Sequence, residues 1–113
     1  MIIDSETRDD SLLLTIQDTR IDAAAAVRFK EQIRQMVTGS EGRVIIDLTT
    51  VEFLDSSGLG ALVAIMKMLG GRKLELAGSG TVVRKVFALT RMDSVFVLHD
   101  TVKDALGSSR DAA

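Results

Sequence analysis

The sequence contains no cysteine, proline, tryptophan or tyrosine. Without cysteine the chain has no disulfide, no thiolate nucleophile and no cysteine-ligated zinc site. Without tryptophan and tyrosine it has few side chains on which nucleotide bases or sugar rings could stack. The single histidine, His99, is too little for a histidine pair or a histidine-rich metal site. These absences exclude several common kinds of catalytic and nucleic-acid-binding site.

The sequence also has little excess charge and no long apolar run. Its formal net charge is −2, so no basic field indicates nucleic acid as a partner. The longest apolar run is interrupted by Lys67 and is far shorter than a membrane span requires. The first residues lack the basic and then apolar order of a signal peptide. The sequence therefore predicts a cytoplasmic protein with no direct nucleic-acid binding and no membrane insertion.

The 113 residues, 46% hydrophobic and 27% charged, suffice for one domain with a sizeable core. Hydrophobic periodicity predicts strands over residues 2–7, 11–17, 43–48, 73–77 and 96–98. The same patterns predict helices over residues 23–37, 59–69 and 81–90, with one or two further turns over 101–106. Strands that alternate with helices predict an α/β sheet with helices packed on it. The small, polar tail, residues 107–113, is expected to be frayed.

The most informative stretch is Asp55-Ser56-Ser57-Gly58, which lies between a predicted strand and the helix over 59–69. Asp and Ser are side chains that cap helix N-termini, and the same position tolerates anions. The stretch is therefore either a helix cap or a loop with an exposed serine that accepts a phosphate. A phosphoserine adds roughly −1.5 to −2 charges, which would oppose the docking of a partner more than it would disturb folding. Asp22 either caps the helix over 23–37 or pairs with Asp55 as an acid–base or metal pair, and the spacing favours the cap.

The helix over 59–69 is apolar on two sides. One side is formed by Leu59, Leu62, Val63 and Met66, and the other by Ala61, Ala64, Ile65 and Met68. A helix on the surface of a sheet needs only one apolar side, so the second side is predicted to contact a partner protein. Small residues at this end would allow close approach, either of a partner or of the helix to its own sheet. They are Gly58, Gly60, Ala61 and Ala64.

The sequence lacks the motifs that an enzymatic function would require. A serine at a strand–helix turn is typical of some hydrolases, but their Gly-x-Ser-x-Gly spacing is absent here. The turn Gly78-Ser79-Gly80 lacks the lysine of a phosphate-binding loop. The sequence therefore predicts a non-enzymatic module with no cofactor and no metal.

Residues 51–60, Val-Glu-Phe-Leu-Asp-Ser-Ser-Gly-Leu-Gly, resemble the signature of the STAS domain, specifically the stand-alone anti-sigma factor antagonists of bacteria. Weaker similarities at residues 20–22, 83–90 and 92–96 extend the resemblance over nearly the whole chain. The resemblance implies a single α/β domain, residues 1–113, with a mixed sheet of about four to five strands and helices mainly on one face. The chain departs from the family pattern at Thr19, Arg20 and Thr81, where many members have glycine, an acidic or variable residue, and proline.

The resemblance also implies a partner switch. An anti-sigma factor that is also a serine kinase binds the unphosphorylated antagonist, phosphorylates the serine after the motif's aspartate, here Ser56, and is released. A metal-dependent serine phosphatase restores the binding form, and the antagonist is a monomer or weak dimer. The predicted partner-binding residues are Asp22, Asp55, Ser56, Ser57, Gly58, Gly60, Ala61, Ala64, Ile65 and Met68. The alternative is an unphosphorylated, constitutive subunit of a transport or secretion-regulating complex.

Overall fold

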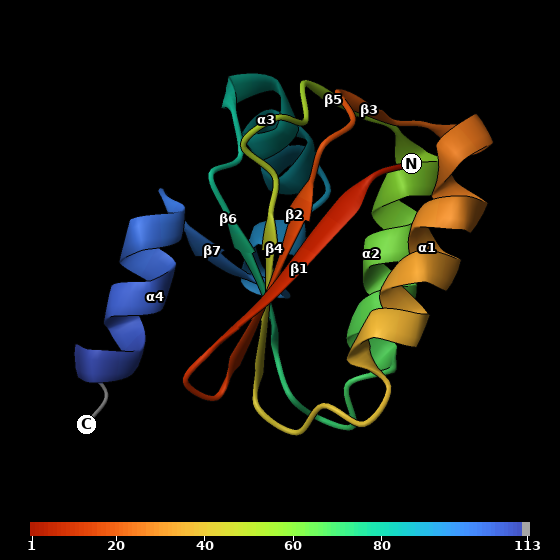
Figure 1. Cartoon of the computed structure of the whole chain (residues 1–113). Helices are drawn as coiled ribbons and strands as arrows, with labels where there is room; N and C mark the ends of the chain where they lie inside the picture. Colours follow the sequence, from red (N-terminus) through yellow and green to blue (C-terminus); the bar gives the residue numbers. More distant parts are fainter. Residues whose placement is uncertain (112–113) are drawn as a thin grey trace.

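A five-stranded mixed sheet forms the centre of the molecule, in a computed structural model that describes residues 1–111 (Figure 1). The strands are β1 (Ile3–Arg8), β2 (Ser11–Ile16), β3 (Arg20–Ile21), β4 (Arg43–Asp47), β5 (Phe53–Leu54), β6 (Leu74–Ala77) and β7 (Val97–His99). The helices are α1 (Ala23–Val37), α2 (Ser56–Lys67), α3 (Thr81–Leu89), the short 3-10 helix η1 (Met92–Ser94) and α4 (Val102–Asp111). The α/β fold predicted from the sequence is confirmed.

The main sheet has the order β1-β2-β4-β6-β7. β1 is antiparallel to β2, and the following neighbours are parallel, which requires a crossover helix between successive parallel strands. The two-residue strands β3 and β5 pair with each other in parallel and form a small second sheet beside the Ser56 loop. This second sheet was not predicted.

Most of the apolar core lies on the face of the sheet covered by α1, α2 and α3. Side chains of β2, β4 and β6 on this face pack with Phe29 of α1, Leu62 and Ile65 of α2, and Phe87 of α3, all of them fully buried. Phe87 also meets Phe96 edge to face, with ring centroids 5.8 Å apart. The helices therefore lie mainly on one face, as the family resemblance implied.

Helix α4 covers the other face of the sheet (Figure 1). It is longer than the one or two turns expected over 101–106, because the helix continues to Asp111. The helix thus extends into the tail that was expected to be frayed, and residues 112–113 lie outside the described part of the chain.

Candidate functional site

The first turns of α1 and α2 meet at the carboxylate of Asp55. Its Oδ1 accepts hydrogen bonds from the backbone N–H groups of Ser57 (2.9 Å) and Gly58 (3.0 Å), so Asp55 is the N-cap of α2. Its Oδ2 accepts a third bond from the N–H of Ala23 at the start of α1 (3.1 Å). One side chain therefore satisfies backbone donors of two helices and fixes the helix start that carries Ser56. The cap on α2 was predicted, but the bond to α1 was not.

Asp22 is the N-cap of α1, and its Oδ1 accepts a bond from the N–H of Ala25 (3.2 Å). Its other oxygen lies 3.6 Å from Nε of Arg20, whose guanidinium carbon lies 4.2 Å from the ring centroid of Phe53. Asp22 and Asp55 are thus separate caps rather than an acid–base pair. Across residues 1–111 no three His, Asp or Glu side chains group in a way that could hold a metal ion.

Gly58 allows α2 to begin directly against β3 and β5. A Cβ atom at this position would collide with the carbonyl oxygen of Ile21 and would lie 2.6 Å from Cδ1 of Leu54. Gly58 is accordingly buried. The prediction that Gly58 contacts a partner is therefore wrong, because the residue serves close packing within the domain.

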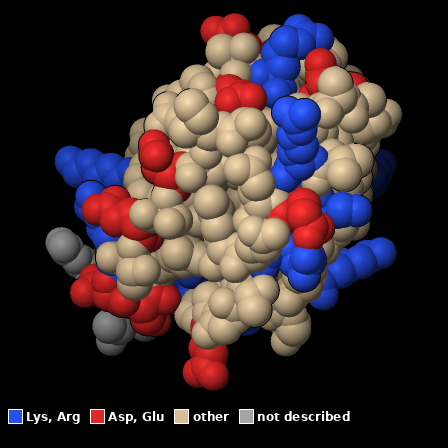
Figure 2. All heavy atoms as spheres, turned by 45° about the vertical axis from the view of Figure 1, so that its right-hand side comes forward, with Lys and Arg blue, Asp and Glu red and all other residues tan. Residues whose placement is uncertain are grey.

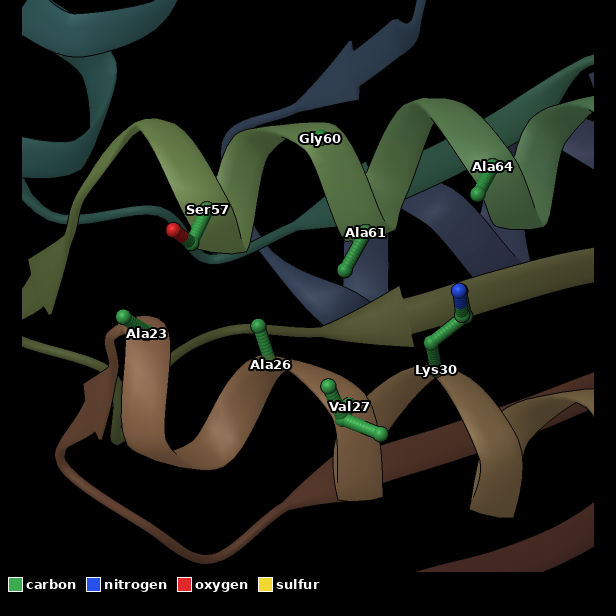
Figure 3. Close-up of a pocket in the computed structure, with 8 residues that line it drawn as sticks. All are labelled: Ala23, Ala26, Val27, Lys30, Ser57, Gly60, Ala61 and Ala64. Atoms are coloured by element: carbon green, nitrogen blue, oxygen red, sulfur yellow. The ribbon is translucent and has the colours of Figure 1, made fainter.

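Ser56 and Ser57 are both exposed, but they face different surroundings. Ser57 borders a shallow groove of about 290 Å³ between α1 and α2 (Figure 3). The groove is lined by Ala23, Ala26, Val27, Lys30, Ser57, Gly60, Ala61 and Ala64. Ser56 lies one residue, or about 100°, round the helix and outside that lining. The small residues of α2 therefore leave a hollow between two helices of the same domain.

The predicted orientation of α2 is wrong in part. Ile65 is fully buried and Ala61 is 6% exposed, so neither lies on an open partner-binding side. Gly60 is exposed, and Ala64 and Met68 are half-buried. The error has a physical cause: an apolar sequence on both sides of a helix does not show which stripe faces the sheet. The side that the sequence assigned to the core is in fact split, with Leu62 buried and Leu59, Val63 and Met66 half-exposed.

A polar network beneath α4 was also missed. Arg43 donates to Glu75 through Nε (2.8 Å) and Nη2 (2.6 Å), and its Nη2 also donates to the carbonyl of Ala105 in α4 (2.8 Å). Nε2 of His99 lies 2.8 Å from Oε1 of Glu75. Burial by itself raises the pKa of Glu75, but the hydrogen bonds from Arg43 and His99 outweigh it and hold that pKa below its ordinary value.

His99 is bonded to Glu75 on the α4 face of the sheet, away from Ser56 and α2. The signal that could have revealed the network is the alternation in β6, where Glu75 must point away from the side of Leu74 and Leu76.

A family model for the STAS domain matches residues 3–105 of the chain. The chain belongs to the STAS domain family. The anti-sigma-F factor antagonist RsfB of Mycobacterium tuberculosis is 32% identical over 112 residues, which cover 89% of this chain and 92% of that protein. The anti-sigma-B factor antagonist of Listeria monocytogenes is 30% identical over 110 residues, 95% of this chain and 96% of that protein.

Solved STAS structures share the fold. An anti-sigma factor antagonist from Mycobacterium paratuberculosis superposes with a TM-score of 0.85 at 30% identity, covering 96% of this chain and 93% of that one. The unphosphorylated antagonist SpoIIAA superposes with a TM-score of 0.77 at 20% identity, over 97% of both chains, and shows likeness of fold alone. Anti-sigma factor antagonists are non-catalytic regulatory proteins, and this STAS domain belongs with them. In residues 1–111 no helix is both long and apolar enough to cross a membrane.

Proposed function

We propose that this STAS domain is a cytoplasmic anti-sigma factor antagonist in a phosphorylation-controlled partner switch. The unphosphorylated form binds an anti-sigma factor that is also a serine kinase. Phosphorylation of Ser56 releases that partner, and a metal-dependent serine phosphatase restores the binding form. The observation that carries the proposal is the position of Ser56, exposed at the start of α2 directly after the Asp55 cap.

The capping geometry supports a switch that acts on docking. A helix start can bind a phosphate through backbone N–H groups that have no other partner. In the structure the N–H groups of Ser57 and Gly58 are bonded to Asp55, so a phosphate would not acquire them while that cap persists. The phosphate would instead add roughly −1.5 to −2 charges beside Asp55 on an exposed surface. A partner seated there would meet concentrated negative charge and a cost of desolvation.

The surroundings of the two serines favour Ser56 over Ser57 as the acceptor. The side chain of Ser57 borders the groove between α1 and α2, so it faces a second helix of the same domain (Figure 3). The hydroxyl of Ser56 lies outside this groove and is reached from solvent. Ser57 is therefore the matched control for Ser56, because it has the same side chain and adjoins the same cap.

The proposal is tested with the cognate anti-sigma factor, Mg-ATP and three forms of the protein. We expect the native protein and Ser57→Ala to lose at least about tenfold in affinity when ATP is added, which corresponds to roughly 1.4 kcal/mol. Ser56→Ala should stay bound, because it cannot take the phosphate. Release of Ser56→Ala by ATP, or a phosphate mapped to Ser57 by peptide mass spectrometry, would contradict the proposal.

A second measurement addresses the protein in its own cells. Intact-mass spectrometry should find a fraction heavier by one phosphate, mapped to Ser56. If no growth condition yields that phosphate, and the protein co-purifies with the same complex in all of them, the constitutive-subunit alternative is supported instead.

A further inference from the structure

Helix α3 has a second apolar stripe that the core does not explain. Val83 and Phe87 are fully buried and attach the helix to the sheet. Val82, Val86 and Leu89 lie on another side, at the helical spacing of four and three residues. Val82 is 56% exposed, Leu89 is 79% exposed and Val86 is half-buried. A helix on a sheet needs one apolar stripe, so this second one is available for another contact.

The neighbouring flank of α2 is also apolar and is half-exposed. Ser57, Ala61 and Ala64 point towards α1 (Figure 3), so Leu59, Val63 and Met66 lie on the flank away from α1.

The helices α1, α2 and α3 connect successive strands in the order β2-β4-β6-β7. Because such crossovers are right-handed, the helices follow one another across the sheet in the same order. Helix α3 therefore lies on the side of α2 that faces away from α1. On α3, Arg84 and Ala88 line a cleft against β7, so the second stripe turns towards α2. Helices α2 and α3 do not pack on each other as α1 and α2 do. We call the combined surface the α2–α3 band; it consists of Leu59, Val63, Met66, Val82, Val86 and Leu89.

The charges beside this band are mainly positive. Lys67 ends α2, Lys85 lies one turn before Leu89, and Arg91 follows α3. Within the described chain none of these three cations forms an ion pair. The nearby acids are Asp55, at the start of α2, and Asp93 of η1. Charge is unevenly spread on the face of the domain in Figure 2, where most basic side chains lie on the right and most acidic ones on the left. A basic edge on a chain of net charge −2 selects an acidic ligand.

We propose that the α2–α3 band binds an acidic amphipathic helix presented by the partner protein, an inference that rests on the proposed function. The apolar side of that helix covers the band, and its acidic side pairs with the three cations. A second copy of this chain fits poorly, because pairing two bands would bring six cations together.

The position of the band gives the phosphate a direct effect on this helix. Leu59 lies one turn after Ser56, so the band begins where the phosphate would be added. Negative charge at that end repels an acidic helix, whereas it would attract a basic one. The charge of the partner thus explains why phosphorylation releases it.

Two synthetic peptides of about four helical turns test the proposal, with leucine at the i, i+3, i+4 and i+7 positions of each. The exposed positions are glutamate in one peptide and lysine in the other. Titration of the isotope-labelled protein, followed by backbone amide NMR, should show the glutamate peptide binding at least about tenfold more tightly, with shifts at the band. Added salt should narrow the difference. Equal affinities, or shifts confined to the α1–α2 groove, would overturn the proposal.

Variants locate the contact. Leu89→Ser should weaken the glutamate peptide about fivefold or more. Val27→Ser is the matched control, since Val27 is 70% exposed on α1 and outside the band, and it should leave the affinity unchanged. An unchanged affinity in Leu89→Ser would overturn the proposal. So would a concentration-dependent dimer of the native protein that Leu89→Ser abolishes, which would assign the band to a second copy.

These results separate the two proposals. Peptide binding is measured without ATP, so it can succeed even if Ser56 is never phosphorylated, and then only the switch fails. If the cognate anti-sigma factor is released by phosphorylation of Ser56 but the peptide does not bind the band, only the band proposal fails. Ser56→Asp should weaken the glutamate peptide and leave the lysine peptide bound equally well or better.

Discussion

The two faces of the sheet are held to their helices by different physics. On one face α1, α2 and α3 bury aliphatic and aromatic side chains, among them Phe29, Leu62 and Phe87. On the other face a single helix, α4, rests on a small apolar cluster and on a carbonyl that accepts a hydrogen bond from Arg43. The first face depends on the area removed from water, whereas the second depends largely on a partly buried ionic network.

This difference separates stability from regulation. The proposed docking surface lies over the first face, where the helices have a deep core beneath them and exposed residues can change without loss of the fold. The α4 face has little apolar area and one carboxylate on which several contacts converge. Substitutions on the second face should therefore destabilise mainly α4, by an amount that depends on pH. Substitutions on the first face should lower the stability of the whole domain, by an amount nearly independent of pH.

The largest effect is expected for Leu62→Ala. Leu62 is fully buried beneath α2, so its truncation leaves a cavity in the main core. We expect the free energy of unfolding to fall by about 3–5 kcal/mol, with no particular dependence on pH. Chemical denaturation at two pH values measures the fall in stability and its dependence on pH. A loss below about 1 kcal/mol would mean that the main core is less tightly packed than described.

Glu75→Gln tests the ionic face. It should lower the free energy of unfolding by roughly 2–3 kcal/mol at neutral pH, because the hydrogen bonds to Arg43 and His99 lose their charged acceptor. The folded-state pKa of Glu75 is lowered, so its contribution is present above the unfolded pKa of about 4.3 and is lost as pH falls through the folded value. The difference between native and variant should therefore shrink in acid. Glu41→Gln, at an exposed acid, is the control and should change little.

Leu106→Ala repeats the leucine truncation on the α4 face. Leu106 is half-buried at the edge of the small cluster, so the free energy of unfolding is expected to fall by only about 1 kcal/mol. Hydrogen exchange should accelerate in α4 and stay unchanged in α1 and α2. A fall in the free energy of unfolding equal to that of Leu62→Ala would remove the distinction between the two faces.

The smallest effect is a gain, expected for Gly80→Ser. Gly80 is the N-cap of α3 but has no side chain to bond the helix N–H groups, and an added Cβ meets open space. A serine there should stabilise the protein by about 0.5–1 kcal/mol through capping and a less flexible unfolded chain. Gly39→Ser is the matched control and should destabilise, because Gly39 has a φ of +84°. Thermal unfolding measures both changes.

Much of the fold could be predicted because the local signals agree with one another. The turn residues Gly39, Gly70 and Gly71 have positive φ values where the sequence ends two helices. Asp22 and Asp55 cap helices, as their positions before helical patterns predicted. The start of α2 was predicted to within three residues, since the helix expected from residue 59 begins at Ser56, because a buried strand pattern precedes it and an apolar helical pattern follows.

The remaining features depend on contacts between distant segments. Which stripe of α2 faces the sheet was not predictable, since Ile65 and Met66 are both apolar and only packing buries one of them more deeply. The Arg43–Glu75 pair joins residues 32 positions apart, and the pairing of β3 with β5 joins two-residue segments with no pattern of their own. Neither follows from a local rule.

The bond between Asp55 and Ala23 also has a consequence for the order of folding. It joins segments 32 residues apart, with α1 and β4 between them in the chain. Contacts of long sequence separation form late, after the entropy of loop closure has been overcome. In a nascent or partly folded chain Ser56 would thus be accessible before Asp55 joins the ends of α1 and α2. A kinase that recognises this geometry would phosphorylate only molecules that have finished folding, so the switch would ignore immature ones.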